Sequence, residues 1–98
     1  MKGSSSKQRS HDQVVRQIAE RLARQKWNVK ADLPGYSKPN PIGKDKRIPD
    51  VEATKHGHRR IVEVETPDTV NKDRKQQQSF RRHAGQKPNT TFDIEVTN

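Results

Sequence analysis

Three acidic residues, Asp50, Glu63 and Glu65, lie on two segments that alternate apolar and polar side chains as β-strands do. Because strand side chains alternate between faces, Glu63 and Glu65 share one face. Like charges that face each other on a sheet are destabilising, so this group indicates a compensating cation. Carboxylates are natural ligands of Mg²⁺, which completes its shell with water and phosphate oxygens. The alternative is an ordinary solvated sheet face, with Lys55 and Arg59 as neutralising neighbours.

The two segments, Ile48–Lys55 and Arg59–Glu65, are predicted to pair as a hairpin around His56-Gly57. A glycine supplies the positive φ that a two-residue hairpin turn requires. In that register Lys55 faces His58, and Asp50 therefore faces Glu63. The apolar side chains of both strands then take the opposite face.

Periodicity places four further elements around the hairpin. Apolar residues at three- and four-residue spacing predict a helix over His11–Gln25, with Ser10 and Gln13 as a capping box. A second helix is expected from about Thr69 to His83, with Asp68 as its N-cap. The remaining strands are Trp27–Leu33 and Thr91–Val96. The resulting order αβββαβ predicts an α/β domain with a mixed four-stranded sheet flanked by two helices.

The string Ile48-Pro49-Asp50, the hairpin and the run Ile61–Glu65 together resemble the signature of the PD-(D/E)XK nuclease superfamily. This restriction-endonuclease-like fold, with an αβββαβ core, includes archaeal Holliday-junction resolvases and RecB-type nucleases. The resemblance covers about residues 11–96. It implies that Asp50 and Glu63 are catalytic metal ligands, and that Glu20 in the first helix is the glutamate that many members add to the metal shell.

The chain departs from this signature at Glu65, which stands where the family usually has a lysine that helps to activate water. Some restriction enzymes of this fold use a glutamate there. A cation from the second helix, Lys72 or Lys75, is the alternative source of positive charge. Gln76 and Phe80 match the spacing of the RecB-type glutamine-x-x-x-tyrosine motif, with phenylalanine in place of tyrosine.

The charge of the chain predicts a polyanionic partner. The 98 residues carry a formal net charge of +9, and only 26% of them are hydrophobic. Lysine and arginine neutralise phosphates and release counterions, so nucleic acid is expected, DNA rather than RNA, and no membrane. The long loop after the first strand and the second helix supply the expected contacts: Tyr36, Lys38, Lys44, Lys46, Arg47, Lys72, Lys75 and Gln76.

Length and composition limit the organisation of the chain. Residues 1–9 read as a flexible basic tail without an apolar signal-peptide region, and residues 10–98 as a single domain in an intracellular, cytoplasmic protein. The absence of cysteine excludes disulfides and thiolate chemistry. A thin core and the family analogy favour a homodimer.

These observations lead to three functional hypotheses. The first is a Mg²⁺- or Mn²⁺-dependent nuclease, an endonuclease-type phosphodiesterase acting on DNA, with Glu20, Asp50, Glu63 and Glu65 as catalytic residues and Asp50, Glu63 and Glu20 holding the metal. The second is a catalytically inactive nucleic-acid-binding module on the same scaffold, suggested by the missing lysine. A small adaptor that contacts an acidic protein is a third, weaker reading.

Overall fold

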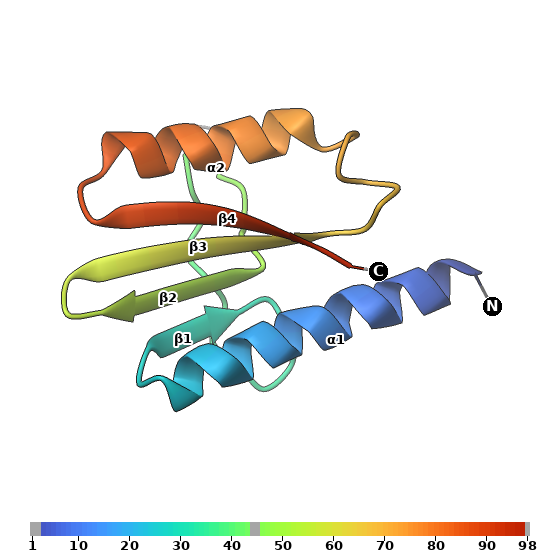
Figure 1. Cartoon of the computed structure of the whole chain (residues 1–98), viewed down its shortest axis with the longest axis horizontal. Helices are drawn as coiled ribbons and strands as arrows, with labels where there is room; N and C mark the ends of the chain where they lie inside the picture. The colour runs from blue at the N-terminus through green and yellow to red at the C-terminus, as the bar shows by residue number, and fades with distance from the viewer. Residues whose placement is uncertain (1–2, 44–45, 98) are drawn as a thin grey trace.

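The computed structural model describes residues 3–43 and 46–97, with side chains from residue 9 onward. Its elements, shown in Figure 1, are α1 (Gly3–Arg24), β1 (Asn28–Ala31), β2 (Val51–Lys55), β3 (His58–Glu65), α2 (Arg74–Gln86) and β4 (Thr90–Val96). The predicted α/β order αβββαβ is therefore confirmed. No helix in the described part of the chain is long and apolar enough to cross a membrane.

The sheet has the order β1-β2-β3-β4. The first three strands are antiparallel, and β4 runs parallel to β3 after the α2 crossover, which makes the sheet mixed as predicted. The hairpin register is also as predicted, because Lys55 pairs with His58 and Val51 with Val62. His56 and Gly57 form the turn with φ values of 50° and 82°, the doubly positive pattern of a type I′ turn.

Helix α1 covers one face of the sheet. Its buried stripe of Val15, Ile18 and Leu22 packs with the inward side chains of β1, β2 and β3 in the larger apolar core. The helix ends in a Schellman motif, in which the Trp27 N–H donates to the Leu22 carbonyl and the Lys26 N–H to the Ala23 carbonyl. Lys26 takes the left-handed position of that motif, with φ 74°.

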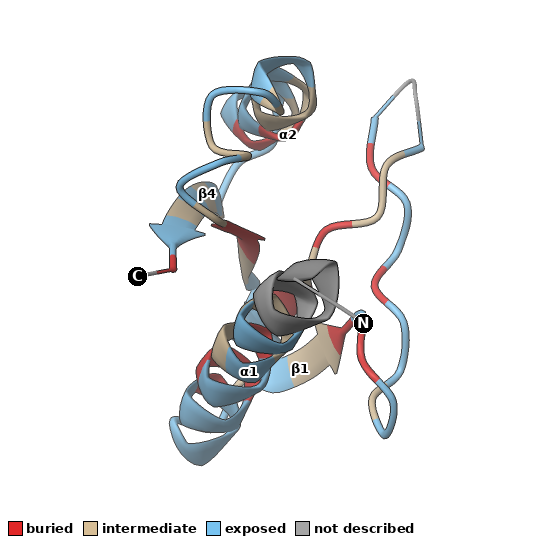
Figure 2. Ribbon diagram, turned by 90° about the vertical axis from the view of Figure 1, so that its right-hand side faces the viewer, coloured by how far each residue is buried: buried red, intermediate tan, exposed pale blue. Residues whose placement is uncertain are grey.

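Helix α2 covers the opposite face, as the view along α1 in Figure 2 shows. Phe80 is fully buried against Ile61 of β3 and Ile42 of the long loop, with Phe92 of β4 packed beside them. The loop between β1 and β2 is thus anchored on the sheet by a core residue. Its backbone also donates from Asn40 N to the Glu52 carboxylate at 3.0 Å.

Several predicted boundaries were wrong. α1 begins at Gly3 and not near His11, so most of the segment expected to be a flexible tail has a helical backbone. α2 begins at Arg74, because hydrogen-bonded turns between Thr66 and Asp73 occupy the predicted first turn of the helix. Asp68 therefore does not cap α2; Asp73 stands at its N-cap without a side-chain cap bond.

Candidate active site

Asp50 and Glu63 meet where the β2–β3 ladder ends. The backbone N–H of Asp50 donates to Glu63 Oε1 at 2.8 Å, and the backbone N–H of Val64 donates to Asp50 Oδ2 at 2.8 Å. Each carboxylate thus accepts a backbone N–H of the other strand, just beyond the last paired residues, Val51 and Val62. The predicted juxtaposition of the two acids is present, and these bonds fix their positions.

Glu63 is a buried acid whose ionisation is unfavourable. The residue is only 3% exposed, and its Oε2 accepts a hydrogen bond from Gln76 Nε2 at 2.8 Å. Burial, followed by the charge of Asp50, raises the pKa of Glu63 to about 8, although the hydrogen bonds from Asp50 N and Gln76 oppose this shift. A positive charge placed here would therefore be strongly favoured.

His11 supplies a positive charge beside Asp50. Its Nε2 lies 3.3 Å from Asp50 Oδ2 and its Nδ1 lies 3.0 Å from Asp12 Oδ1. The hydrogen bond to Asp50 is the largest cause of a rise in the pKa of His11 to about 9, so the ring is an imidazolium at neutral pH. The sequence prediction missed this residue, although the spacing of His11, Val15, Ile18 and Leu22 places it on the buried stripe of α1.

Glu65 points to the same face as Glu63 but has a different set of contacts. It is 2% exposed and accepts a hydrogen bond from Thr69 Oγ1 at 2.7 Å. Burial raises the pKa of Glu65; the Thr69 bond opposes this shift, and the adjacent Asp73 adds to it. Thr69 also bonds the backbone N–H of Thr66. Glu65 therefore holds the segment that leads from β3 into α2.

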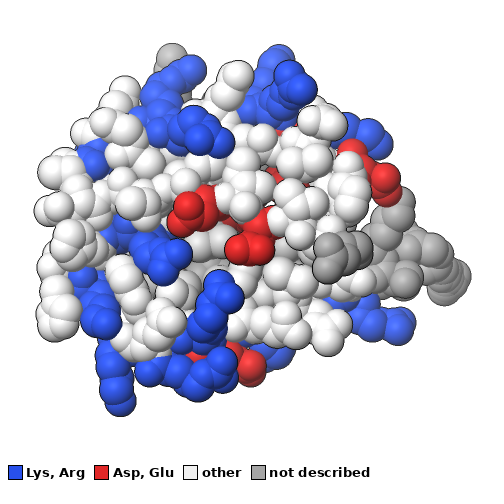
Figure 3. Space-filling view, in the orientation of Figure 1, with Lys and Arg blue, Asp and Glu red and all other residues white. Residues whose placement is uncertain are grey.

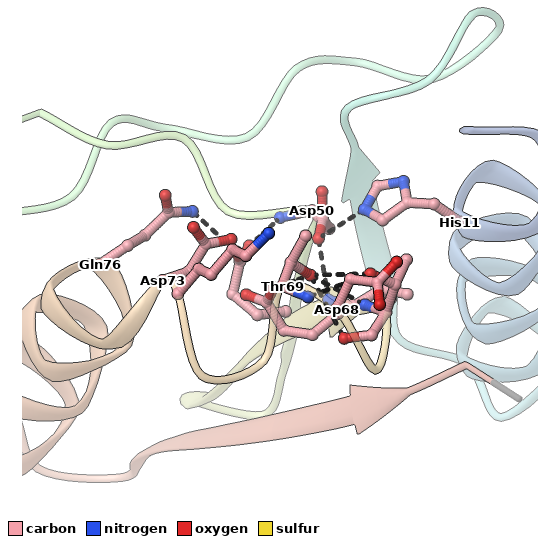
Figure 4. A pocket seen from close by; sticks show the side chains of 11 residues that line it. His11, Asp50, Asp68, Thr69, Asp73 and Gln76 are labelled. Carbon is pink, nitrogen blue, oxygen red and sulfur yellow. Dashed lines mark hydrogen bonds and ion pairs between the residues drawn. The ribbon is translucent and has the colours of Figure 1, made fainter. Parts of the chain in front are cut away.

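These residues line a cavity of about 430 Å³ between the N-terminal part of α1 and the start of α2. Figure 4 shows His11 reaching in from α1 and Gln76 from α2, with Asp50 between them. Lys72 also lines the cavity, on the segment that precedes α2. We call this cavity the acid pocket; its lining is His11, Asp50, Glu63, Val64, Glu65, Thr66, Asp68, Thr69, Lys72, Asp73 and Gln76.

Glu20 does not join the acid pocket. It is exposed on α1 and is absent from the residues that line the cavity. The reason is helical geometry: Glu20 follows His11 by nine residues, which at ~100° per residue turns it to the opposite side of the helix and ~13 Å further along the axis. The helical residue beside Asp50 is His11.

Glu52, the fourth acid of the hairpin, is neutralised elsewhere. Its Oε2 lies 2.7 Å from both Nε and NH2 of Arg59, and the residue is 5% exposed. Arg59 in turn donates from NH1 to His83 Nε2 at 2.9 Å. Glu52 and Arg59 therefore form a largely buried ion pair between β2 and β3, while the other oxygen of Glu52 holds the loop through Asn40 N.

The residues predicted to contact nucleic acid separate into groups. Lys72 and Gln76 line the acid pocket, and Lys75 lines a second groove on α2. Lys38 and Lys46 are exposed on the long loop. Tyr36 packs against the larger core, and the backbone of Arg47 bridges to Ile42. Lys44 lies outside the described residues.

The donor set suits a hard divalent cation held by few protein ligands. Within residues 9–43 and 46–97, no group of three His, Asp or Glu side chains is arranged to hold a metal. Mg²⁺ is commonly bound through one or two carboxylates, with water and substrate phosphate as its other ligands. Asp50 and Glu63 meet that requirement, while the predicted set that includes Glu20 is not assembled.

Comparison of the chain with protein-family models, with curated proteins and with solved structures finds no match.

Proposed function

We propose that this protein is a metal-dependent phosphodiesterase that acts on DNA, with the acid pocket as its active site. The observation that carries this proposal is the pair of Asp50 and Glu63, which hydrogen bonds from backbone N–H groups hold side by side. Burial and the charge of Asp50 raise the pKa of Glu63 to about 8, so this arrangement is costly. Buried structural acids are normally paired with cations, whereas the donors that bond to Glu63 are a backbone N–H and the Gln76 amide. A site that retains this cost is a functional candidate.

Asp50 and Glu63 would hold one Mg²⁺ or Mn²⁺. That ion would supply the charge that polarises a phosphodiester and a water molecule. Gln76, through its bond to Glu63 Oε2, orients this carboxylate for the ion. His11, through its contact with Asp50 Oδ2, does the same for Asp50.

Lys72 supplies the positive charge that the motif lysine, replaced here by Glu65, usually provides. Lys72 lines the same cavity as Asp50 and Glu63, whereas Lys75 lines a different groove. A cation at this position offsets negative charge that develops on a phosphoryl group. Glu65 is then a positioning residue, because its bond to Thr69 holds the segment that carries Lys72.

The resemblance to PD-(D/E)XK nucleases supports the same assignment. The element order, the hairpin register and the acids at 50 and 63 agree with that signature. The net charge of +9 favours a polyanionic substrate. Figure 3 shows lysine and arginine side chains over α2 and over α1, the two elements that flank the sheet. We expect an intracellular location for a protein that acts on DNA.

Cleavage of DNA by the purified protein tests this proposal. Wild type and Asp50→Asn are incubated with plasmid, four-way junction and flapped DNA in Mn²⁺, with Glu20→Gln as the matched acid-to-amide control on α1. Wild type and Glu20→Gln are expected to cut at least one substrate, and Asp50→Asn to lose at least about a hundredfold in rate. Equal inactivity of wild type and Asp50→Asn on every substrate would exclude catalysis.

A non-catalytic DNA-binding module is the second candidate, and the contacts of Glu65 favour it. The position that usually carries the catalytic lysine holds a buried acid bonded to Thr69. This alternative predicts tight, steeply salt-dependent binding that neither Mn²⁺ nor Asp50→Asn changes.

A further inference from the structure

A second groove, which we call the α2 groove, lies along helix α2 beside the part of the helix that borders the acid pocket. Its volume is about 420 Å³, and its lining is Gly43, Lys75, Gln78, Ser79, Arg82, His83 and Gln86. The helical members recur at three- and four-residue spacing, so they form one stripe along α2. Gly43 of the long loop forms the facing wall and approaches Ser79 closely, since a Cβ built on Gly43 would lie 3.2 Å from Ser79 Oγ.

The α2 groove is a set of hydrogen-bond donors without acids. Among the described residues, no aspartate or glutamate lines it, whereas five acids line the acid pocket. Lys75 and Arg82 are exposed cations, and amide and hydroxyl groups stand between and beside them. Such a lining suits phosphate oxygens, which accept hydrogen bonds and carry negative charge.

Charges behind the groove do not cancel its positive field. Glu52, the buried acid bonded to the same Arg59 that contacts His83, is already neutralised by Arg59 at 2.7 Å. Arg59 also donates to His83 Nε2, and because a guanidinium can only donate, that ring nitrogen is an acceptor. The neutral ring then carries its hydrogen on Nδ1, a further donor.

The dimensions of the stripe favour a polymer over a single ion. Lys75 and Gln86 are eleven residues apart, ~16 Å along the helix axis. A free phosphate would use only a short part of that length, whereas a nucleic-acid strand presents a phosphate at each nucleotide. α2 also contributes Gln76 to the acid pocket, so one rigid helix borders both cavities.

We propose that the α2 groove binds backbone phosphates of the DNA strand whose scissile phosphodiester lies in the acid pocket, with Lys75 and Arg82 as the principal contacts. This inference rests on the proposed function for its substrate. It adds a subsite, away from the reacting group, that sets the path of the strand. α2 is then the element that aligns the substrate with the carboxylates.

Binding of labelled DNA, measured by fluorescence anisotropy in EDTA over a range of salt concentrations, tests this subsite without cleavage. The test variant is Lys75→Gln/Arg82→Gln. The control is Arg16→Gln/Arg21→Gln, which removes the same charge from exposed positions on α1. The test variant is expected to bind DNA at least about tenfold more weakly than wild type. Its plot of log Kobs against log salt should also be less steep, by about 1.8 in slope, for two lost phosphate contacts. The control is expected to lose much less.

Equal losses in the two double variants, or none in either, would overturn the subsite. Inorganic phosphate is added as a competitor at constant ionic strength, to distinguish a groove that binds the DNA backbone from one that binds a free phosphate ion. Phosphate is expected to displace DNA no better than chloride does. Preferential displacement that disappears in Lys75→Gln/Arg82→Gln would assign the groove to a small anion and overturn the proposal. Circular dichroism of each variant establishes that it is folded.

The experiments distinguish failure of the catalytic proposal from failure of the subsite proposal. Selective loss of binding in Lys75→Gln/Arg82→Gln, together with a wild type that never cuts DNA, would retain the subsite and remove the catalytic function. Cleavage that depends on Asp50, together with equal binding losses in both double variants, would retain the catalytic function and remove the subsite.

Discussion

At the level of single residues, the candidate site is defined by how its charges are held. Asp50 and Glu63 each accept a backbone N–H of the other strand, and His11 contributes an imidazolium beside Asp50. The sequence was sufficient to pair the two acids, because a two-residue turn determines the hairpin register. It was not sufficient to find His11, because that contact depends on how α1 docks on the sheet.

The protonation of His11 and Glu63 predicts a dependence of stability on pH. The pKa of His11 is raised from 6.5 to about 9, so its contribution is complete below pH 6.5 and is lost as the pH rises through 9. The pKa of Glu63 is raised from 4.5 to about 8, so folding stability also falls as the pH rises from 4.5 to 8. Wild type is therefore expected to become less stable from weakly acidic to alkaline pH.

Urea denaturation across this pH range, at constant ionic strength, measures the effect. In His11→Gln, the free energy of unfolding should fall less at alkaline pH than in wild type. The difference should be about 1 kcal/mol, because solvent screens the partly exposed ring. Asp12 and Asp50 are the acids that face this ring, so the change should disappear when both are replaced by asparagine. A His11→Gln curve parallel to that of wild type would contradict this account.

Glu63→Gln is expected to stabilise the fold while it removes metal binding. At about pH 9 the wild-type carboxylate is ionised in a buried position beside Asp50. An amide that keeps its oxygen on Asp50 N, with the Gln76 amide turned to accept from its NH2 group, relieves that repulsion by about 1–2 kcal/mol. Glu95→Gln, on the exposed face of β4, is the matched control and should change stability by less than about 0.5 kcal/mol. Destabilisation by Glu63→Gln would mean that the acid serves the fold.

At the level of elements, periodicity was enough to predict the order and the faces of the sheet. Val62 and Val64 pack under α1, while Ile61 packs under α2, as strand alternation requires. The start of α2 was not predictable in this way, because Thr69 bonds to Glu65 and Thr66 and holds the preceding segment in turns. Side-chain bonds of this kind compete with a helical first turn.

The contact between the long loop and α2 gives a prediction at the element level. Gly43 has φ 75°, and an added Cβ would lie 3.2 Å from Ser79 Oγ. Gly43→Ala should therefore destabilise the protein by both backbone strain and contact, about 1–2 kcal/mol in total. Thermal or urea unfolding measures this cost.

Gly57→Ala is the control for strain alone, because Gly57 has φ 82° with no atom within 4 Å of the added Cβ. The extra loss in Gly43→Ala should be recovered by a second change, Ser79→Ala. Equal losses at the two glycines would show that the approach of the loop to α2 has no energetic importance.

At the level of the whole molecule, charge and topology act together. The parallel pairing of β3 and β4 follows from the α2 crossover, which places α2 on the face opposite α1. Asp50 and Glu63 therefore lie between the two helices, where α1 contributes His11 and α2 contributes Gln76. Most of the basic charge lies outside this cavity, along the surfaces that a polyanion would follow.

The central claim is that the acid pocket binds a divalent cation, and a residue-resolved NMR titration with Mn²⁺ tests it most directly. Paramagnetic broadening of backbone amide signals should begin at Asp50, Glu63 and Val64, and then extend to Lys72 and Gln76. The signal of Glu20, which is exposed on α1 away from the acid pocket, should persist, and Asp50→Asn should abolish the selective broadening. Uniform broadening, or broadening centred on another group of acids, would contradict the claim.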